Sequence, residues 1–106
     1  MNLEHISVHK FRDMIDDDRY LILDVRTKDE FNEGHVENAT LIDFYEDNFM
    51  DEIAKLDPEK EYLVYCHSGG RSGKAMNMMG QMGFKNVYNM SGGMIDWLEN
   101  QYEVIK

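Results

Sequence analysis

Short apolar runs alternate with amphipathic stretches along this chain, and this alternation limits the folds available to it. Several of the runs are apolar without interruption and rich in β-prone residues, which is typical of parallel strands buried on both faces. The expected strands cover residues 6–7, 20–25, 39–42, 62–65 and 86–90. Because helical stretches separate these strands, we predict an α/β fold with a parallel or mostly parallel sheet.

Four segments carry apolar side chains at helical spacing. The positions are Phe11, Met14 and Ile15; Phe49, Ile53 and Leu56; Ala75, Met78, Met79 and Met82; and Met94, Trp97 and Leu98. Ser7 and Asp47 are the expected N-caps of the first two helices. The methionines of the third segment are expected to form adaptable core packing. With 106 residues and no repeat or linker, the chain is predicted to form a single domain over residues 1–106.

The charge and composition exclude several classes of partner. A formal net charge of −10 argues against nucleic acid, because phosphate backbones require clustered Lys and Arg. No apolar run approaches the roughly 20 residues of a membrane span, so no membrane partner is expected. The N-terminal sequence lacks the apolar core of a signal peptide. A single cysteine cannot form an internal disulfide and stays available in a reducing compartment, so we expect a cytoplasmic location.

The only cysteine, Cys66, lies where an apolar strand ends and a helix begins, in the sequence YLVYCHSGGRSGKA. The dipole and unpaired N–H groups of a helix N-terminus stabilise a thiolate and also bind anions. Gly69 and Gly70 are expected to adopt positive φ, so that successive amides point inward. Arg71 follows at a spacing that suits an anion beside the thiolate. Because ligands bind at the carboxyl ends of parallel strands, the pattern predicts a reactive-thiol site.

A buried structural cysteine is the alternative to a reactive thiol. A lone cysteine after a buried strand is often a small hydrophobe, but such a residue requires neither the glycine pair nor Arg71. No acidic residue lies between Glu61 and Asp96, so the stretch around Cys66 is locally basic in an acidic chain. The histidines His5, His9, His35 and His67 are scattered without zinc-ligand spacing, and neither a metal nor another cofactor is expected.

Three motifs in order make the chain resemble a single-domain rhodanese, of the thiosulfate sulfurtransferase family. LILDVRTKDEFNEGHVENATLI is similar to the family's LDVR followed by E-F-x-x-G-H-I and a short strand. YLVYCHSGGRSGKA is similar to its active-site strand, cysteine loop and helix, and GFKNVYNMSGGMIDW to its closing strand, Gly-Gly and tryptophan. The resemblance covers nearly the whole chain and implies a five-stranded parallel sheet with helices on both faces.

The resemblance also implies a mechanism and a set of site residues. The thiolate of Cys66 would attack the outer sulfur of a small donor, thiosulfate or a persulfide, and hold that sulfur as a persulfide. A thiol, cyanide or a sulfur-accepting protein would then take the sulfur. Backbone amides of the loop would stabilise the persulfide and the donor's oxygens, and Arg71 would complement the donor's charge. The substrate-binding residues implied are His67, Ser68, Gly69, Gly70, Arg71 and Ser72.

Other matched positions are expected to support the site. Asp24 is interpreted as a hydrogen-bond organiser of neighbouring loops, and Arg26 is expected to pair with Glu30, four residues later. His67 follows the nucleophile directly, but adjacency alone does not make it a general base. Asn38 stands where the family commonly has glycine, and the turn is expected to persist because asparagine tolerates left-handed geometry.

Two other functions stay open. Phosphatases of the dual-specificity, cell-cycle type have this fold but use a longer loop, C-x-x-x-x-x-R, whereas this chain has the tighter C-x-x-x-x-R, suited to a sulfane sulfur. The second alternative is a non-catalytic binding module, a redox sensor or a sulfur carrier. The presence of Cys66 and Arg71 disfavours the non-catalytic module but leaves the redox sensor and the sulfur carrier open. The discriminating observation is whether sulfur moves to small acceptors or only to a protein.

Overall fold

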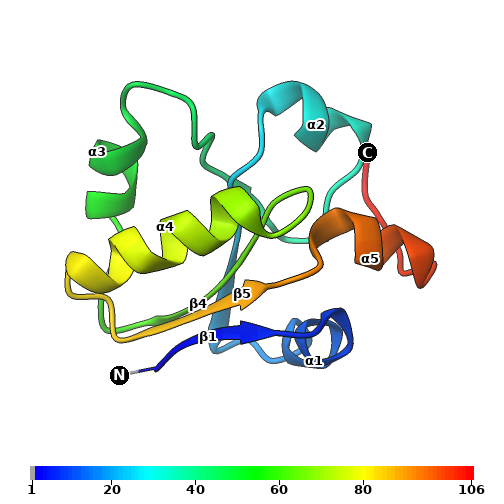
Figure 1. Ribbon diagram of the computed structural model, residues 1–106, viewed down its shortest axis with the longest axis horizontal. Helices are drawn as coiled ribbons and strands as arrows, with labels where there is room; N and C mark the ends of the chain where they lie inside the picture. Colours follow the sequence, from blue (N-terminus) through cyan, green and yellow to red (C-terminus); the bar gives the residue numbers. More distant parts are fainter. Residues whose placement is uncertain (1) are drawn as a thin grey trace.

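The computed structural model describes residues 2–106, and its strands form one five-stranded parallel sheet (Figure 1). The strands are β1 (Asn2–Ile6), β2 (Tyr20–Asp24), β3 (Thr40–Leu41), β4 (Glu61–Tyr65) and β5 (Asn86–Met90). They lie in the order β1-β5-β4-β2-β3, and every neighbouring pair is parallel. The predicted parallel α/β sheet is therefore confirmed.

The edge strands are where the sequence predicted the sheet least well. β1 covers Asn2–Ile6 rather than residues 6–7. The prediction was too short because only Ile6 of this strand is buried, so β1 has no run of apolar residues in the sequence. β3 has only two residues of the expected 39–42. The central strands β2, β4 and β5 begin and end within one residue of the predicted bounds. Their side chains are mostly buried, which produces the continuous apolar runs.

The connections contain the helices α1 (Val8–Met14), α2 (Lys28–Glu33), α3 (Phe49–Ala54), α4 (Gly70–Gln81) and α5 (Gly93–Glu99). Only α2 was not predicted: none of its residues is buried, so it has no apolar stripe, and a capping box between Thr27 and Glu30 starts it instead. Ser7 caps α1 as expected. The Asp47 cap is wrong, because α3 starts after Asn48 without a side-chain cap bond. Over residues 2–106, every helix is too short or too polar to cross a membrane.

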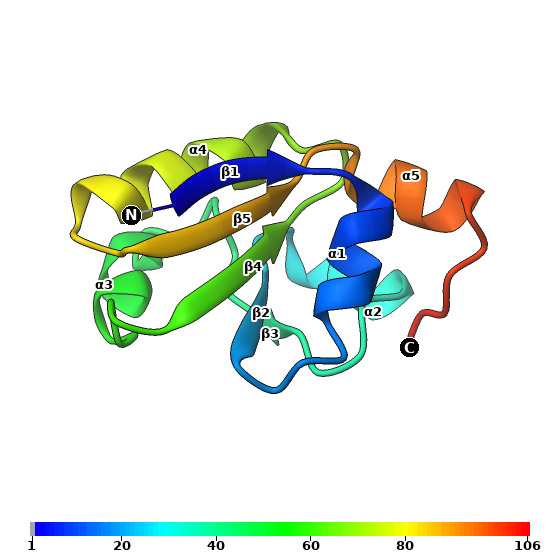
Figure 2. The ribbon, with the colours of Figure 1, turned by 90° about the horizontal axis from the view of Figure 1, so that it is seen from below.

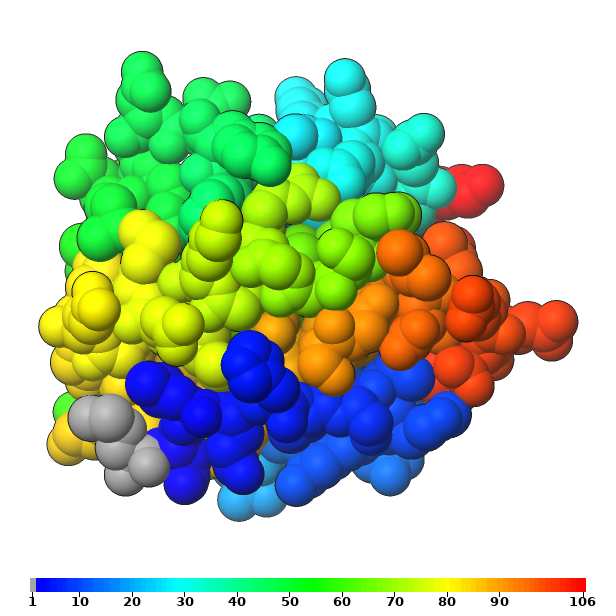
Figure 3. All heavy atoms as spheres, in the orientation of Figure 1, coloured from blue at the N-terminus to red at the C-terminus, as the bar shows by residue number. Residues whose placement is uncertain are grey.

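Helices cover both faces of the sheet, as the family resemblance implied (Figure 2). On one face, α3 and α4 pack Ile53 and Met79 against β2, β4 and β5, so the expected methionine core is confirmed. On the other face, α1 and α5 pack Phe11 and Trp97 with their rings edge to face, 6.3 Å between centroids. In the space-filling view, α4 (lime to yellow) runs between the α3 segment and β1 (Figure 3).

The carboxyl ends of β2 and β4 lie side by side. Asp24 is in register with Tyr65, and the Val25 N–H donates to the Tyr65 carbonyl at 3.1 Å. Cys66 follows β4 directly, and Arg26 lies two residues beyond the end of β2. The sheet therefore brings the cysteine loop and the segment after β2 to one edge, which is the edge where ligands bind in parallel α/β sheets.

Candidate active site

The cysteine loop, residues 66–72, turns directly from β4 into the first turn of α4. Cys66 is the first residue after the strand and is 1% exposed. Its Sγ accepts hydrogen bonds from the Gly69 N–H at 3.2 Å, from the Ser72 N–H at 3.4 Å and from the Ser72 hydroxyl at 3.3 Å. The thiol thus faces a ring of donors at the start of a 12-residue helix.

The ring changes the acidity of the thiol. Burial opposes ionisation, but hydrogen bonds from the Ser72 side chain and from the N–H groups of Ser72, Ser68 and Gly69 outweigh it. The pKa of Cys66 therefore lies below its ordinary value. No side-chain base forms a hydrogen bond with Sγ in the loop, and these donors favour the thiolate, the form that acts as a nucleophile.

The two loop glycines have different roles. Gly69 has φ +95°, and a Cβ there would lie 2.1 Å from the Ser91 carbonyl oxygen, so only glycine fits. Gly70 is the first residue of α4 and has no positive φ, and a Cβ there would meet nothing within 4 Å. The expectation of positive φ is confirmed for Gly69 and wrong for Gly70, because the helix already begins at Gly70.

The underside of the loop is held by β5 and α5, which sequence analysis missed as parts of the site. The Met94 and Ile95 N–H groups, in the first turn of α5, donate to the carbonyls of Cys66 and His67 at 3.0 and 3.1 Å. Gly93 has φ +60°, and a Cβ there would lie 2.4 Å from the His67 carbonyl oxygen. The pair Gly92-Gly93 at the start of α5 was the available signal, since a close backbone approach requires glycine.

Asn89 of β5 supports the loop from below. Its Nδ2 donates to the Gly69 carbonyl at 3.2 Å and lies 3.0 Å from His5 Nδ1. The side chain is buried, and its Oδ1 has no hydrogen-bond partner among the described residues. No sequence motif identified this residue, because a single asparagine in an apolar strand carries no periodic signal.

A buried network lies under the site and contains Asp24, Arg26 and Tyr65. Asp24 accepts from the Arg26 N–H, Nε and Nη2, the last at 2.7 Å, and from the Tyr65 hydroxyl at 2.6 Å. Arg26 Nη2 also donates to the Gly34 carbonyl, and the Tyr65 hydroxyl accepts from the Val36 N–H. Asp24 therefore ties the segments around β2, β3 and β4 together through hydrogen bonds, and burial beside this carboxylate raises the pKa of Tyr65.

The expected pair between Arg26 and Glu30 does not form. Arg26 is bound to Asp24, and Glu30 instead receives both terminal nitrogens of Arg71, at 2.8 and 2.9 Å. The ring of Tyr45 lies over the Arg71 guanidinium, 5.6 Å from its centroid. The hydrogen bonds from Arg71 lower the pKa of Glu30 from 4.5 to about 2, so both partners of this pair are charged.

His67 is exposed and borders a cleft of about 260 Å³ beside the loop. The cleft is lined by Arg26, Glu30, Glu33, Gly34, His67, Met94, Leu98 and Val104. It therefore joins residues from α2, the cysteine loop, α5 and the C-terminal segment. The predicted site residues Arg26 and His67 meet there, although they lie 41 positions apart in the sequence.

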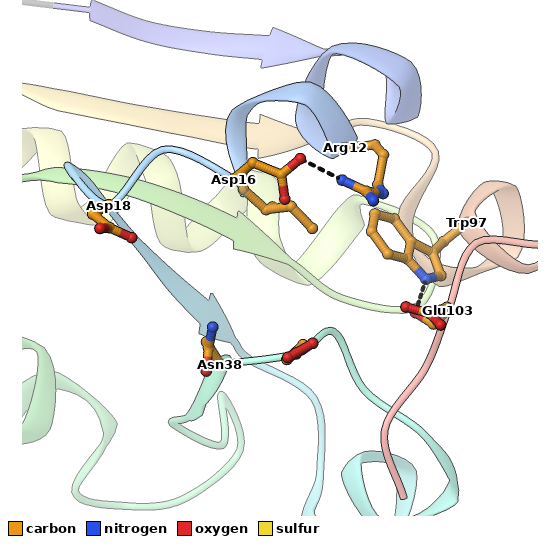
Figure 4. Close-up of a pocket in the computed structure, with 8 residues that line it drawn as sticks. Arg12, Asp16, Asp18, Asn38, Trp97 and Glu103 are labelled. Carbon is orange, nitrogen blue, oxygen red and sulfur yellow. Dashed lines mark hydrogen bonds and ion pairs between the residues drawn. The ribbon is translucent and has the colours of Figure 1, made fainter.

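A second cleft, of about 230 Å³, contains none of the predicted site residues (Figure 4). Arg12 donates to Asp16 at 3.1 Å within it, and Trp97 Nε1 donates to the Glu103 carbonyl at 2.9 Å. Asn38 lines this cleft with φ +70°, which confirms the left-handed geometry expected there. The cleft holds no thiol and lies outside the cysteine loop, so we place the candidate active site at Cys66.

Comparisons with known proteins agree with the fold. The profile of the Rhodanese-like domain matches residues 7–100. A rhodanese-related protein from Thermoplasma volcanium superposes with a TM-score of 0.85 at 28% identity, over 96% of this chain and 97% of that one. The polysulfide-sulfur transferase of Wolinella succinogenes, solved as a homodimer, superposes with a TM-score of 0.79 at 29% identity, over 95% of this chain and 77% of that one.

Curated relatives are much longer than this chain. A protein named tRNA uridine(34) hydroxylase from Yersinia pestis (strain Pestoides F) is 35% identical over 109 residues, which is 96% of this chain but 30% of the relative. The protein of the same name from Hamiltonella defensa is 33% identical over 101 residues, 90% of this chain and 28% of the relative. The chain thus spans less than a third of these relatives.

Proposed function

The chain belongs to the rhodanese-like domain family, and we propose that it is a sulfurtransferase that carries sulfur on Cys66. It takes a sulfane sulfur from a donor such as thiosulfate or a persulfide and passes it to a thiol, to cyanide or to a sulfur-accepting protein. The observation that carries the proposal is the buried thiol with three hydrogen-bond donors around Sγ and a lowered pKa. No step requires a cofactor.

The first half of the reaction forms a persulfide. The Cys66 thiolate attacks the outer sulfur of thiosulfate, a new S–S bond forms, and the donor's S–S bond breaks. Sulfite leaves with the electron pair, and the negative charge remains on the outer sulfur of the Cys66 persulfide. The Gly69 and Ser72 donors that now face Sγ are suited to stabilising this anion without reorganisation.

The second half returns the enzyme to its starting state. An acceptor thiolate or cyanide attacks the outer persulfide sulfur, and Cys66 leaves as a thiolate. The same hydrogen bonds that lower the pKa of Cys66 also make it a better leaving group. Because nucleophile and leaving group are both anions, neither half requires His67 as a general base.

The proposal is tested by the intact mass of the protein after incubation with excess thiosulfate or with an alkyl persulfide, followed by removal of the donor. Wild-type protein should gain the mass of one sulfur atom, which cyanide then removes as thiocyanate. Cys66→Ser should gain none. No sulfur on the wild type with either donor, or equal gain on the variant, would contradict the proposal.

A sulfur-carrier or redox-sensing module is the second candidate. Two apolar side chains of α5 next to the loop, Ile95 and Leu98, are 41% and 54% exposed, which favours contact with a protein at this site. The relatives named tRNA uridine(34) hydroxylase contain this domain within longer chains, which also favours a role beside other domains. A loaded Cys66 persulfide that resists small thiols and cyanide, and transfers only to a protein thiol, would select this candidate.

We also propose a cytoplasmic location. Both candidates depend on a free thiol at Cys66, and a reducing compartment keeps such a thiol available.

A further inference from the structure

The charge of Arg71 is already compensated within the protein. Its two terminal nitrogens bind the two oxygens of Glu30 at 2.8 and 2.9 Å, the bidentate geometry with which a guanidinium would otherwise bind an incoming oxyanion. The side chains are 17% and 28% exposed, so the pair is partly shielded from solvent. The Tyr45 ring lies over the guanidinium, 5.6 Å from its centroid. An anionic donor would have to share a cation that a carboxylate already holds.

No other Arg or Lys at the loop replaces it. Arg26 is 5% exposed and is bound to Asp24 and to the Gly34 carbonyl. Residues 67–70 contain no Lys or Arg, and Lys74, three residues beyond Arg71 on α4, is exposed to solvent, where salt screens its charge. Glu33 adds a further negative charge to the cleft beside the loop. Within each of the pairs Arg26–Asp24 and Arg71–Glu30 the two charges cancel, so the described residues around the thiolate attract a dianion weakly.

We propose that Glu30 sets the donor specificity of this site, by holding Arg71 so that the enzyme favours donors without an anionic sulfonate group, such as alkyl persulfides, over thiosulfate. The inference rests on the proposed function, since it concerns which donor loads Cys66. The persulfide step balances without a further reagent. The Cys66 thiolate bonds to the outer sulfur of R–S–S–H, the donor's S–S bond breaks, and R–S⁻ leaves with the electron pair. The proton stays on the transferred sulfur or passes to the leaving thiolate.

The test compares the rates at which thiosulfate and an alkyl persulfide without other charged groups load Cys66, followed by intact mass. Glu30→Gln removes one negative charge while keeping an oxygen that can accept from Thr27 and Arg71. We expect the thiosulfate-to-persulfide rate ratio to rise about tenfold in this variant. The matched control is Asp29→Asn, which removes the same charge from an exposed position of α2 and should keep the wild-type ratio.

Salt dependence separates a charge effect from a change in shape. In the wild type, salt should accelerate loading by thiosulfate, because it screens repulsion between a dianion and a chain of net charge −10. In Glu30→Gln this acceleration should disappear or reverse, because the charge of Arg71 is no longer compensated and attracts the donor. Loading of Cys66 with an unchanged donor ratio and salt dependence in Glu30→Gln would overturn this inference alone. No loading by either donor would overturn the proposed function as well.

Discussion

The buried network of Asp24, Arg26 and Tyr65 and the cysteine loop lie next to each other but are stabilised in different ways. In the network, charged side chains satisfy one another and are closed to solvent, with Asp24 0% and Arg26 5% exposed. In the loop, backbone N–H groups point at a single sulfur. The network therefore holds the segments in place, whereas the loop sets the reactivity of the thiol. Substitutions in the network should therefore change stability first, and those in the loop should change thiol chemistry first.

Asp24→Asn should have the largest effect, a loss of about 3–5 kcal/mol in the free energy of unfolding. The buried Arg26 would keep its charge and lose its carboxylate partner, which lies 2.7 Å away. Urea unfolding at pH 7 measures the loss. Asp16→Asn is the matched control, because it breaks the exposed pair with Arg12 and should cost about 0.5 kcal/mol. Equal losses of unfolding free energy in the two variants would show that the buried network contributes no more to stability than an exposed ion pair.

Gly69→Ala should cost about 1–3 kcal/mol and displace the loop, because the residue has φ +95° and its new Cβ would meet the Ser91 carbonyl. The displaced Gly69 N–H would no longer reach Sγ, so the pKa of Cys66 should rise. Unfolding and the pH dependence of thiol alkylation measure the two effects. Gly70→Ala is the control: its Cβ has open space within a helix, where Ala is favoured over Gly by about 1 kcal/mol, so this variant should be no less stable than the wild type.

Ser72→Ala should cost about 1 kcal/mol, since one buried hydrogen bond to Sγ is lost. Its clearer effect is on pH dependence. The hydroxyl favours the thiolate, so its removal raises the pKa of Cys66, and the midpoint of alkylation rate against pH moves to higher pH. Ser68→Ala keeps its backbone N–H and should move the midpoint less. A larger shift in Ser68→Ala than in Ser72→Ala would contradict the hydrogen bonding described here.

Glu30→Gln should have the smallest effect on stability, about 1 kcal/mol or less at pH 7, because the pair with Arg71 is partly solvated. The pKa of Glu30 is lowered from 4.5 to about 2 in the folded protein, so its contribution is fully present well above pH 4.5 and is lost as the pH falls toward 2. The difference in unfolding free energy between wild type and variant should therefore be larger at pH 7 than at pH 3. A difference that does not depend on pH would show that Glu30 acts through shape alone.

The central strands and the position of the thiol were predictable from the sequence. β4 and β5 are continuous buried runs, and α4 carries a clear apolar stripe, so their bounds and the position of Cys66 between them follow from local periodicity. β1 and α2 lie where burial is slight, so the periodic signal is weak and the predictions failed or were absent. The capping-box residues Thr27 and Glu30 indicate the start of α2, but a search for apolar periodicity alone does not detect them.

The partners of the charged residues were not predictable. Arg26 and Glu30, four residues apart, were expected to pair, yet Arg26 turns to Asp24 and Glu30 binds Arg71, 41 positions away. The same applies to Asn89 under Gly69 and to the first turn of α5 under Cys66. Apart from the local pair Arg26–Asp24, these contacts depend on the strand order β5-β4-β2, which local patterns do not encode.

Local sequence patterns are enough to specify the alternation of strands and helices and to place the thiol of Cys66 at a strand end. They do so because burial imposes a period on neighbouring residues. The surroundings of that thiol depend on tertiary packing, which sets the N–H groups that reach its sulfur and brings Glu30 to the nearby Arg71. Hydrogen bonds and ion pairs act over a few ångströms, so their partners are fixed only when distant segments have packed together.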